Sequence, residues 1–170
     1  MVIALSKYDA STAYPGQKTF DCEHQAINGF VANGLKQQVQ RGLSVAYVLT
    51  DDGDGGRLIG FCTLMAASIG RTDLAAISPP SLPQAVPVTK LAMLGVDKRY
   101  KGQGCGRQLL RHAIRVMLDT AQSMGMYGVY LDADPGAADF YLQLDFKLLK
   151  PRQEGVATPM FLHIATARPA

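Results

Sequence analysis

The chain has 170 residues, of which 48% are apolar and 18% are charged, and its formal net charge is +3. This length predicts one domain, residues 1–170. No apolar run approaches the length of a membrane span, which argues against a membrane-spanning protein. No secretory signal is visible, and three cysteines without paired spacing argue against a disulfide framework or a zinc site. We therefore expect a metal-free protein of the reducing cytoplasm.

Apolar runs of strand length recur along the chain and are separated by turns and helical patterns. After the first run, Asp21 is the expected N-cap of one continuous helix that extends past Val39. Asp and Gly residues at 51–56 predict a hairpin turn between the next two runs. The expected strands are Val2–Leu5, Ser44–Leu49, Leu58–Ser68, Thr89–Val96, Tyr127–Ala133, Phe146–Leu149 and Met160–Ile164.

The second half of the chain begins with a proline-rich segment, residues 70–87, in which we expect no regular structure. Such a long irregular segment is either a flap on the substrate side or a variable surface loop. A helical pattern then runs from Cys105 to Met124 with an apolar side that we expect to be buried. Asp134 and Pro135 predict the cap and first turn of a short helix to Leu144. Strands and helices mixed in this order indicate an α/β (α+β) domain.

The stretch from Arg99 to Arg107 carries the strongest functional signal. It reads Arg-Tyr-Lys-Gly-Gln-Gly-Cys-Gly-Arg and joins the strand at 89–96 to the long helix. A strand, a glycine-rich turn and a helix N-terminus present unpaired N–H groups to a phosphate, so we expect a polyphosphate site. The residues expected to contribute are Arg99, Lys101, Gly102, Gln103, Gly104, Cys105, Gly106 and Arg107.

Two common nucleotide sites do not fit this turn. A Walker loop ends in Gly-Lys-Ser or Gly-Lys-Thr, whereas this turn ends in Gly106-Arg107-Gln108, without a hydroxyl for magnesium. A dinucleotide site needs Gly-x-Gly-x-x-Gly near the first strand, but these glycines lie in the second half of the chain.

A third pattern does fit. Arg99-x-x-Gly102-x-Gly104 resembles the turn with which GNAT acyltransferases bind the pyrophosphate of coenzyme A. Downstream, residues 137–146 resemble the Ala-x-x-Phe-Tyr-x-x-x-Gly-Phe segment of that family, although Asp145 replaces the usual Gly.

A narrower resemblance appears upstream. Residues 20–30, which begin Phe-Asp-Cys, are similar to the opening of a GNAT branch that includes the TacT-like toxins of toxin–antitoxin modules, although Glu23 replaces a Gly. Leu94-Gly95-Val96-Asp97 is similar to the stretch before the pyrophosphate turn of that branch. Asp134 stands where Asn is frequent.

The resemblance implies a single GNAT-like domain with a mostly antiparallel curved sheet, flanking helices and a splayed central strand. It implies acetyl-CoA as co-substrate, with the pantetheine arm and acetyl carbonyl bound by the backbone at Leu94, Gly95 and Val96, and with Phe140 beside the coenzyme. It also implies transfer of the acetyl group to the amine of aminoacyl-tRNA, a cognate ribbon-helix-helix antitoxin and a homodimer.

Tyr141 is the expected catalytic residue. A thiolate leaves when an amine attacks a thioester, and a tyrosine hydroxyl, with a pKa of about 10, can donate a proton to a sulfur whose thiol pKa is about 8.5. In the family the Tyr of Phe-Tyr does this; from the residues alone, Tyr141 reads as a core aromatic. No general base is evident, since an α-amine with a pKa of about 8 is partly neutral already. The titratable residues considered for this site are His24, His112, His163, Asp132, Asp134 and Cys105, of which His112 reads as a surface residue.

Basic residues concentrate between positions 90 and 115, where Asp97 is the one acidic residue. The cluster serves coenzyme A alone or also a nucleic-acid backbone, and Arg111 and Arg115 fit a solvated helix face equally well. Three functions therefore stay open: an aminoacyl-tRNA acetyltransferase toxin, an acetyltransferase for a small amine or a protein N-terminus, and a non-catalytic acyl-CoA-binding module. The basic residues are Lys90, Lys98, Arg99, Lys101, Arg107, Arg111 and Arg115.

Overall fold

The computed structural model describes residues 1–77 and 81–168. Contacts between Cα atoms divide the chain into two compact units, and each unit is described by itself. The first unit contains Met1–Met65 and Ala92–Ala113, and the second contains Ala66–Leu91 and Ile114–Ala170. The single domain expected from the length of the chain stays a prediction.

The described strands are β1 Ile3–Lys7, β2 Val45–Asp51, β3 Arg57–Gly70, β4 Ala85–Val96, β5 Gly128–Ala133, β6 Lys147–Leu148 and β7 Thr158–His163. The described helices are α1 Gln25–Asn33, α2 Leu35–Gln40, α3 Cys105–Thr120, α4 Ala138–Leu142 and α5 Ile164–Ala167. The strands pair in the order β1-β2-β3-β4-β5-β7-β6. The recorded pairs are antiparallel except for the parallel pair β4–β5, so the mixed, mostly antiparallel sheet is confirmed. None of the described helices is long and apolar enough to cross a membrane.

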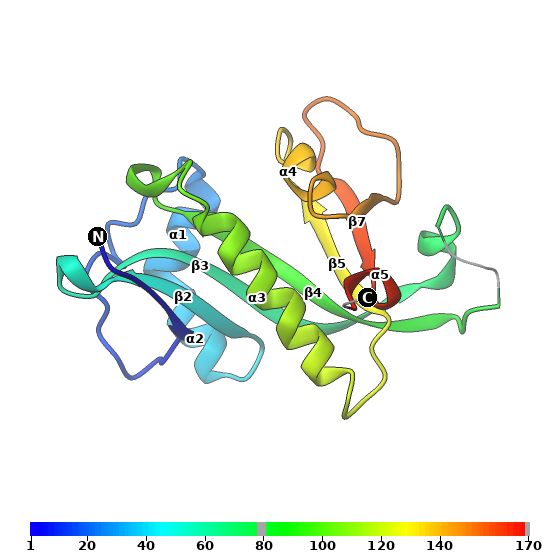
Figure 1. Cartoon of the computed structure of the whole chain (residues 1–170), viewed down its shortest axis with the longest axis horizontal. Coiled ribbons are helices and arrows are strands. Elements are labelled where there is room, and N and C mark those ends of the chain that lie inside the picture. Colours follow the sequence, from blue (N-terminus) through cyan, green and yellow to red (C-terminus); the bar gives the residue numbers. More distant parts are fainter. Residues whose placement is uncertain (78–80, 169–170) are drawn as a thin grey trace. The chain divides into compact units, whose positions relative to one another are not determined.

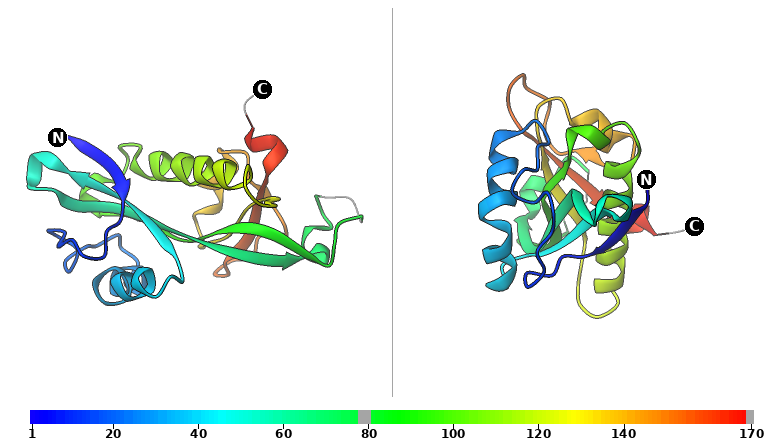
Figure 2. Two further views of the ribbon diagram at one scale, coloured as in Figure 1. Left: turned by 90° about the horizontal axis from the view of Figure 1, so that it is seen from below. Right: turned by 90° about the vertical axis from the view of Figure 1, so that its left-hand side faces the viewer.

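In the first unit, helices cover both faces of β1, β2 and the first part of β3. Figures 1 and 2 show α1 and α2 on one face and the start of α3 on the other. Val48 on β2 lies opposite Phe61 on β3, and both side chains are fully buried. Val31 and Leu35 from the two small helices are buried in the same core, and each such side chain contributes about 1.5–3 kcal/mol.

The hairpin predicted at 51–56 is confirmed. The carboxylate of Asp51 accepts the N–H of Gly53 at 3.0 Å and caps a short 3-10 turn over Asp52–Asp54. Gly55 and Gly56 follow with φ angles of 66° and 78°, which side chains rarely tolerate. The Asp and Gly residues therefore close the hairpin for the reason that their types predict.

In the second unit, β5 lies between the start of β4 and β7. It pairs with β7 over all six of its residues. Its parallel pairing with β4 is recorded at Thr89–Val129 and Lys90–Tyr130. Figure 1 shows α4 beyond the carboxyl end of β5, and α5 follows β7 directly.

The first helix begins later than predicted and is interrupted. His24, not Asp21, is the N-cap of α1, and its Nδ1 accepts the N–H of Ile27 at 3.3 Å. The chain breaks at Gly34 before α2, so the prediction of one continuous helix was wrong. A Cβ on Gly34 would lie 3.0 Å from the ring of Phe30, so a larger residue at the break would crowd that ring.

The long helix α3 begins at Cys105, as predicted, but ends at Thr120. The hydroxyl of Thr120 donates to the carbonyl of Val116 at 2.9 Å, and turn hydrogen bonds follow instead of further helix. Met124 therefore lies outside the helix and is 61% exposed, so the prediction that it is buried was wrong.

Asp134 and Pro135 form a turn rather than the start of α4. The N–H of Ala137 donates to the carbonyl of Asp134 at 2.9 Å, and Gly136 has a φ of 88°. Pro at the second position and left-handed Gly at the third define a type II turn. Ala137 is the N-cap of α4, without a side-chain hydrogen bond, and α4 ends at Leu142, so the predicted cap and extent were wrong.

The proline-rich segment 70–87 is more regular than predicted. Arg71–Leu74 form a 3-10 turn, and β4 begins at Ala85 and includes Pro87. Pro87 is exposed, and its carbonyl accepts the N–H of Tyr127 at 2.8 Å. Proline lacks an N–H donor, and the strand tolerates this loss at an exposed position. Residues 78–80 of this segment lie outside the described residues.

Candidate functional site

The turn between β4 and α3 has the geometry of an open anion site. Asp97 caps a 3-10 turn over Lys98–Tyr100, and Gly102 and Gly104 then have φ angles of 76° and 82°. A Cβ at either glycine would meet no protein atom within 4 Å. Glycine is therefore required by the left-handed backbone rather than by crowding, and the open space leaves this backbone accessible to a ligand.

We expect the amide N–H groups from Lys101 to Arg107 to be available to such a ligand. In the part of the chain that the structure describes, none of them donates to a backbone acceptor in the turn or its surroundings. The first N–H groups of a helix have no partner within it, and the helix dipole makes this end positive. The arrangement suits a phosphate or diphosphate group, as the sequence predicts.

The charged side chains at the start of the turn contact protein groups. Arg99 donates from Nε to Oδ1 of Asp97 at 3.1 Å. Lys101 Nζ donates to the carbonyl of Cys22 at 3.0 Å and lies 3.4 Å from Oε1 of Glu23. Their predicted contacts with a coenzyme therefore compete with internal ones. These contacts, and those of Gln103, Gly106 and Arg107 farther along, stay predictions.

Two buried carboxylates anchor the turn, and the sequence analysis missed both. Tyr100 donates its hydroxyl to Asp51 at 2.8 Å, and this hydrogen bond lowers the pKa of Asp51. Burial raises the pKa of Asp97, but N–H donors from Arg99 and Asp21 outweigh it, so the pKa lies below its ordinary value. The signal for Asp97 was its N-cap position directly before the turn.

The end of β4 packs closely against the first unit's core. Gly95 is buried, and a Cβ there would lie 3.2 Å from the ring of Phe61 and 3.4 Å from Sγ of Cys22. Leu94 is half-buried and Val96 is 9% exposed. The recorded pairing of β4 with β5 lies upstream of these residues. Their predicted backbone contacts with a pantetheine arm stay a prediction.

In the second unit, α4 fixes the ring of Tyr141. Tyr141 is 9% exposed, and its ring packs edge to face on Phe140 and Phe146, with centroids 5.1 Å and 5.7 Å away. Asp145, at a φ of 72°, makes the turn that returns the chain to Phe146, where the resembling segment has Gly. A phenol held by packing suits a proton donor. The predicted roles of Tyr141 and Phe140 toward the coenzyme stay predictions.

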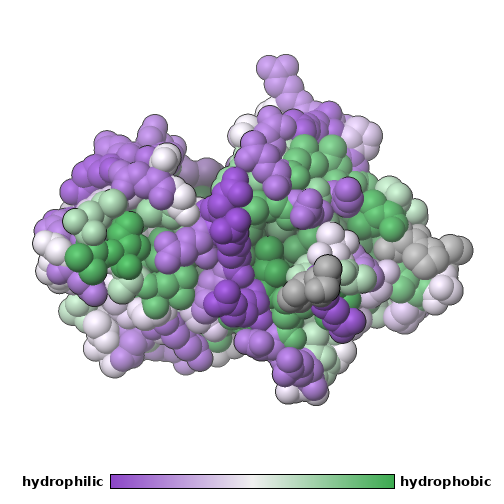
Figure 3. Space-filling view, in the orientation of Figure 1, coloured by the Kyte–Doolittle hydropathy of each residue, from purple (hydrophilic) through white to green (hydrophobic). Residues whose placement is uncertain are grey.

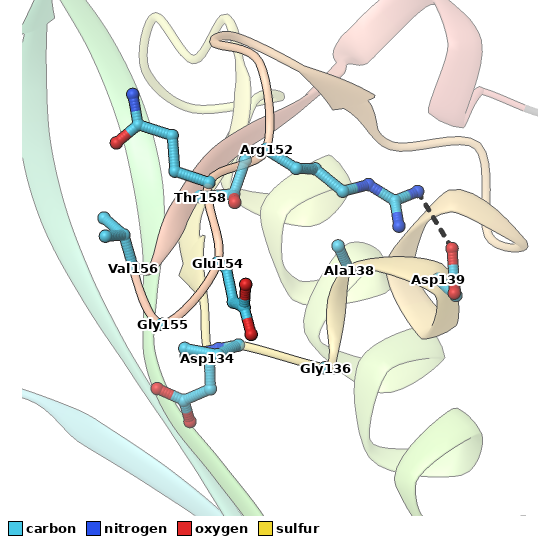
Figure 4. Close-up of a pocket in the computed structure, with 11 residues that line it drawn as sticks. Asp134, Gly136, Ala138, Asp139, Arg152, Glu154, Gly155, Val156 and Thr158 are labelled. Atoms are coloured by element: carbon cyan, nitrogen blue, oxygen red, sulfur yellow. Dashed lines mark ion pairs between the residues drawn. The ribbon is translucent and has the colours of Figure 1, made fainter.

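A cavity of about 270 Å³ lies beside α4 in the second unit (Figure 4). The turn before α4, the start of α4 and residues 152–156 line it. Arg152 forms a 2.8 Å ion pair with Asp139 on α4, and Asp134 and Glu154 also line the cavity. A water molecule occupies about 30 Å³, so the cavity has room for a small organic group. The sequence analysis did not single out residues 152–156, which carry no recognisable motif.

The other titratable candidates have structural roles. His24 and His163 cap α1 and α5 through Nδ1. His112 is half-buried with its ring 4.4 Å from that of Tyr47, so its interpretation as a surface residue was wrong. Cys105 is 3% exposed and burial raises the pKa of its thiol, which favours packing over nucleophilic chemistry. Among the described residues, no His, Cys, Asp or Glu side chains group as metal ligands.

Basic residues also extend along α3 beyond the turn. Arg111 and Arg115 are exposed, and Figure 3 shows hydrophilic residues over this helix. An exposed row of guanidinium groups can contact a phosphate backbone.

The fold is that of a known family. The model of the acetyltransferase (GNAT) domain matches residues 42–148, a range that includes the β4–α3 turn and Phe140-Tyr141. The chain belongs to the GNAT acetyltransferase family.

Two curated relatives are toxins by name. The chain is 34% identical over 94 residues to the tRNA-acetylating toxin of Mycobacterium tuberculosis, a match that covers 55% of this chain and 57% of the relative. It is 34% identical over 88 residues to the probable toxin TacT of Sinorhizobium fredii, covering 51% of this chain and 48% of that protein. The matches thus span about half the length of these relatives.

Solved structures match over nearly the whole chain. The crystal structure of a bacterial toxin is 36% identical, with a TM-score of 0.92, and the match covers 98% of this chain and 93% of that one. AtaT complexed with acetyl-methionyl-tRNAfMet has a TM-score of 0.83 at 24% identity, with coverage of 97% and 96%. A mutant AtaT bound to the C-terminus of the antitoxin AtaR and acetyl-CoA has a TM-score of 0.80 at 22% identity, with coverage of 97% and 95%. At these identities the two AtaT structures show a shared fold.

Proposed function

We propose that this protein is an N-acetyltransferase that moves the acetyl group of acetyl-CoA to the free α-amine of aminoacyl-tRNA. The observation that carries the proposal is the open β4–α3 turn, with its left-handed glycines and available amides, in a chain of the GNAT family. The names of the relatives, including a tRNA-acetylating toxin, support this acceptor over a small amine or a protein N-terminus.

In this proposal the coenzyme is held mainly by main-chain groups. The amides from Lys101 to Arg107 bind the diphosphate, and the side chains of Arg99, Gln103 and Arg107 add contacts at its edges. The backbone of residues 94–96 hydrogen-bonds the pantetheine arm and the acetyl carbonyl, and Phe140 lies beside the coenzyme. Main-chain donors suit this task because they cost no side-chain entropy on binding.

The acetyl transfer is direct. The nitrogen of the α-amine attacks the thioester carbon, an N–C bond forms and the C–S bond breaks. Tyr141 donates its hydroxyl proton to the departing sulfur, and the positively charged nitrogen of the tetrahedral intermediate loses a proton to solvent to give the amide. The tyrosinate then takes a proton back from solvent. No general base is assigned, because an α-amine has a pKa of about 8 and orientation in the ternary complex supplies the remaining rate.

The acceptor end of the tRNA enters beside α4. The cavity there has room for a small group, and α4, which forms part of its wall, carries Tyr141 one turn farther on. The exposed Arg111 and Arg115 contact the phosphate backbone of the tRNA. N-acetylation of the aminoacyl group blocks peptide-bond formation by that amine, so the enzyme arrests translation.

We further propose that the chain is the toxin of a toxin–antitoxin pair in the cytoplasm, neutralised by a ribbon-helix-helix antitoxin and active as a homodimer. The names of both curated relatives and the AtaT–AtaR complex support the toxin role and an antitoxin partner. Expression of the chain alone should arrest growth, and co-expression of its cognate antitoxin should restore it.

The decisive assay is acetylation of a complete aminoacyl-tRNA pool. The protein is incubated with radiolabelled acetyl-CoA and charged tRNA, and the aminoacyl esters are released and identified by mass spectrometry. We expect N-acetylated amino acid from one or more isoacceptors and no label on deacylated tRNA. Label on free amines or peptide N-termini, with none on any aminoacyl-tRNA, would establish the other acetyltransferase function instead.

A further inference from the structure

The Phe20-Asp21-Cys22 segment has no role in the proposed chemistry, yet it contacts the coenzyme turn directly. The N–H of Asp21 donates to Oδ2 of Asp97 at 3.3 Å, and the N–H of Lys98 donates to the carbonyl of Asp21 at 2.8 Å. These two bonds tie the segment to the exact point where β4 passes into the turn. Asp97 is 2% exposed, so its end of this connection is buried, whereas Asp21 is half-buried.

The same segment also contacts both ends of the 3-10 turn through lysine side chains. Lys101 Nζ donates to the carbonyl of Cys22 at 3.0 Å, and Lys98 Nζ lies 3.0 Å from the carboxylate of Asp21. The turn is therefore fixed on both sides, directly before Gly102 and the open amides. Because glycines offer little conformational restraint of their own, the fixed residues before them set where the amides point.

Asn28 on α1 holds the segment in shape without touching the turn. Its Oδ1 accepts the N–H of Cys22 at 2.8 Å, and its Nδ2 donates to Oδ1 of Asp21 at 3.0 Å. The Asp21 carboxylate also accepts the N–H of Glu23 at 2.9 Å. A series of hydrogen bonds thus connects Asn28 on α1 to residues 21 and 22, and residues 21 and 22 to Asp97 and the turn.

We propose that Asp21, Asn28 and Asp97 are positioning residues that hold the β4–α3 turn in its coenzyme-binding conformation. This inference rests on the proposed coenzyme site. None of the three contacts the coenzyme; they keep the amides of the turn oriented before it arrives, so binding does not have to order the turn. Asp21 and Asn28, which lie in the segment that resembles a toxin branch of the family, thereby contribute to coenzyme affinity without contacting the coenzyme.

Asn28→Ala is the most informative variant, because any effect on the coenzyme must pass through residues 21 and 22. Its matched control is Asn33→Ala, the same change at an exposed position at the end of α1. Binding of coenzyme A is measured by calorimetry on the full chain, and acetyl transfer to aminoacyl-tRNA gives KM for acetyl-CoA and kcat. We expect Asn28→Ala to raise Kd and KM about tenfold, while kcat at saturating acetyl-CoA changes less than twofold and Asn33→Ala changes neither. A tenfold weakening corresponds to about 1.4 kcal/mol.

Asp97→Asn tests the other end of the connection. Its control is Asp9→Asn, which also removes a carboxylate with three hydrogen bonds, all to Ser11 and Thr12. We expect Asp97→Asn to raise Kd and KM at least as much as Asn28→Ala does. A lower calorimetric stoichiometry with unchanged Kd would mean that the residues only stabilise the fold, and it would overturn the inference. If the unmodified chain bound no coenzyme A, the proposed function itself would fail, so the two failures are distinguishable.

Discussion

Replacing Tyr141 with Phe tests the proposed proton donor with little disturbance of the fold. The ring is 9% exposed and packs edge to face on Phe140 and Phe146, and Phe keeps both ring contacts. The change therefore removes one hydroxyl, and the expected loss of stability is at most about 0.5–1.5 kcal/mol, the net value of one hydrogen bond.

The expected loss of activity is much larger. A positioned general acid contributes about 100-fold to 10,000-fold, which corresponds to about 2.7–5.4 kcal/mol of the activation barrier. We therefore expect kcat for aminoacyl-tRNA acetylation to fall by at least about 100-fold, with KM for acetyl-CoA nearly unchanged. The phenotype should follow, since cells that express Tyr141→Phe should grow.

Tyr8→Phe is the matched control for Tyr141→Phe. Tyr8 is 4% exposed, its ring stacks on that of Tyr14, and its hydroxyl hydrogen-bonds Gln17. The control should lose a similar amount of stability and keep kcat within twofold. If Tyr141→Phe kept kcat within fivefold while both variants melted alike, Tyr141 would be a packing residue and the mechanism would need another donor.

Three further predictions concern stability. Glu23 has a φ of 67°, and a left-handed non-glycine residue costs about 1–2 kcal/mol; Glu23→Gly should stabilise the chain in urea unfolding by up to about 1 kcal/mol, and a lower midpoint would refute the strain argument. Gly128→Ala should destabilise by more than about 3 kcal/mol, because its Cβ would overlap the carbonyl of Leu162; a melting temperature within 3 °C of the parent's would contradict that geometry. The pKa of Asp21 is about 2 and that of Asp97 is also lowered, so stability from both is complete above about pH 4 and is lost as pH falls through their folded pKa values. Asp21→Asn should therefore reduce the slope of stability against pH between about pH 4 and pH 2, and an unchanged slope would count against it.

The sequence predicted the backbone of the β4–α3 turn well because its signals are local. Glycines at 102 and 104 and the start of a helical pattern at Cys105 depend on backbone rules that act within a few residues. The hairpin at 51–56 was predictable for the same reason. Each of these features needs no knowledge of what the segment packs against.

The errors occurred where two local signals compete. Asp134-Pro135 fits a helix start, but the following Gly136 selects a type II turn, and the Pro-Gly pair was the signal to follow. Asp21 fits an N-cap, yet its carboxylate bonds Asn28 and Lys98 instead. Asp21 and Asp97, which hydrogen-bond each other, lie 76 residues apart, so no spacing rule reveals this contact.

Two positions depart from the glycines of the family pattern, and the sequence alone did not reveal the backbone conformation there. Glu23 and Asp145 replace glycines, and they are the two non-glycine residues with positive φ among the described residues. The backbone is left-handed at both places, which is the conformation that the glycines of the family pattern favour. Asp tolerates this region better than Glu does, so the strain concentrates at Glu23.

The measurement that tests the central claim most directly is a crystal structure of the chain with bound acetyl-CoA. The account predicts the diphosphate within hydrogen-bond distance of amides between Lys101 and Arg107, and the hydroxyl of Tyr141 directed at the thioester sulfur. A diphosphate bound away from the β4–α3 turn, or a Tyr141 hydroxyl pointing away from the sulfur, would contradict it.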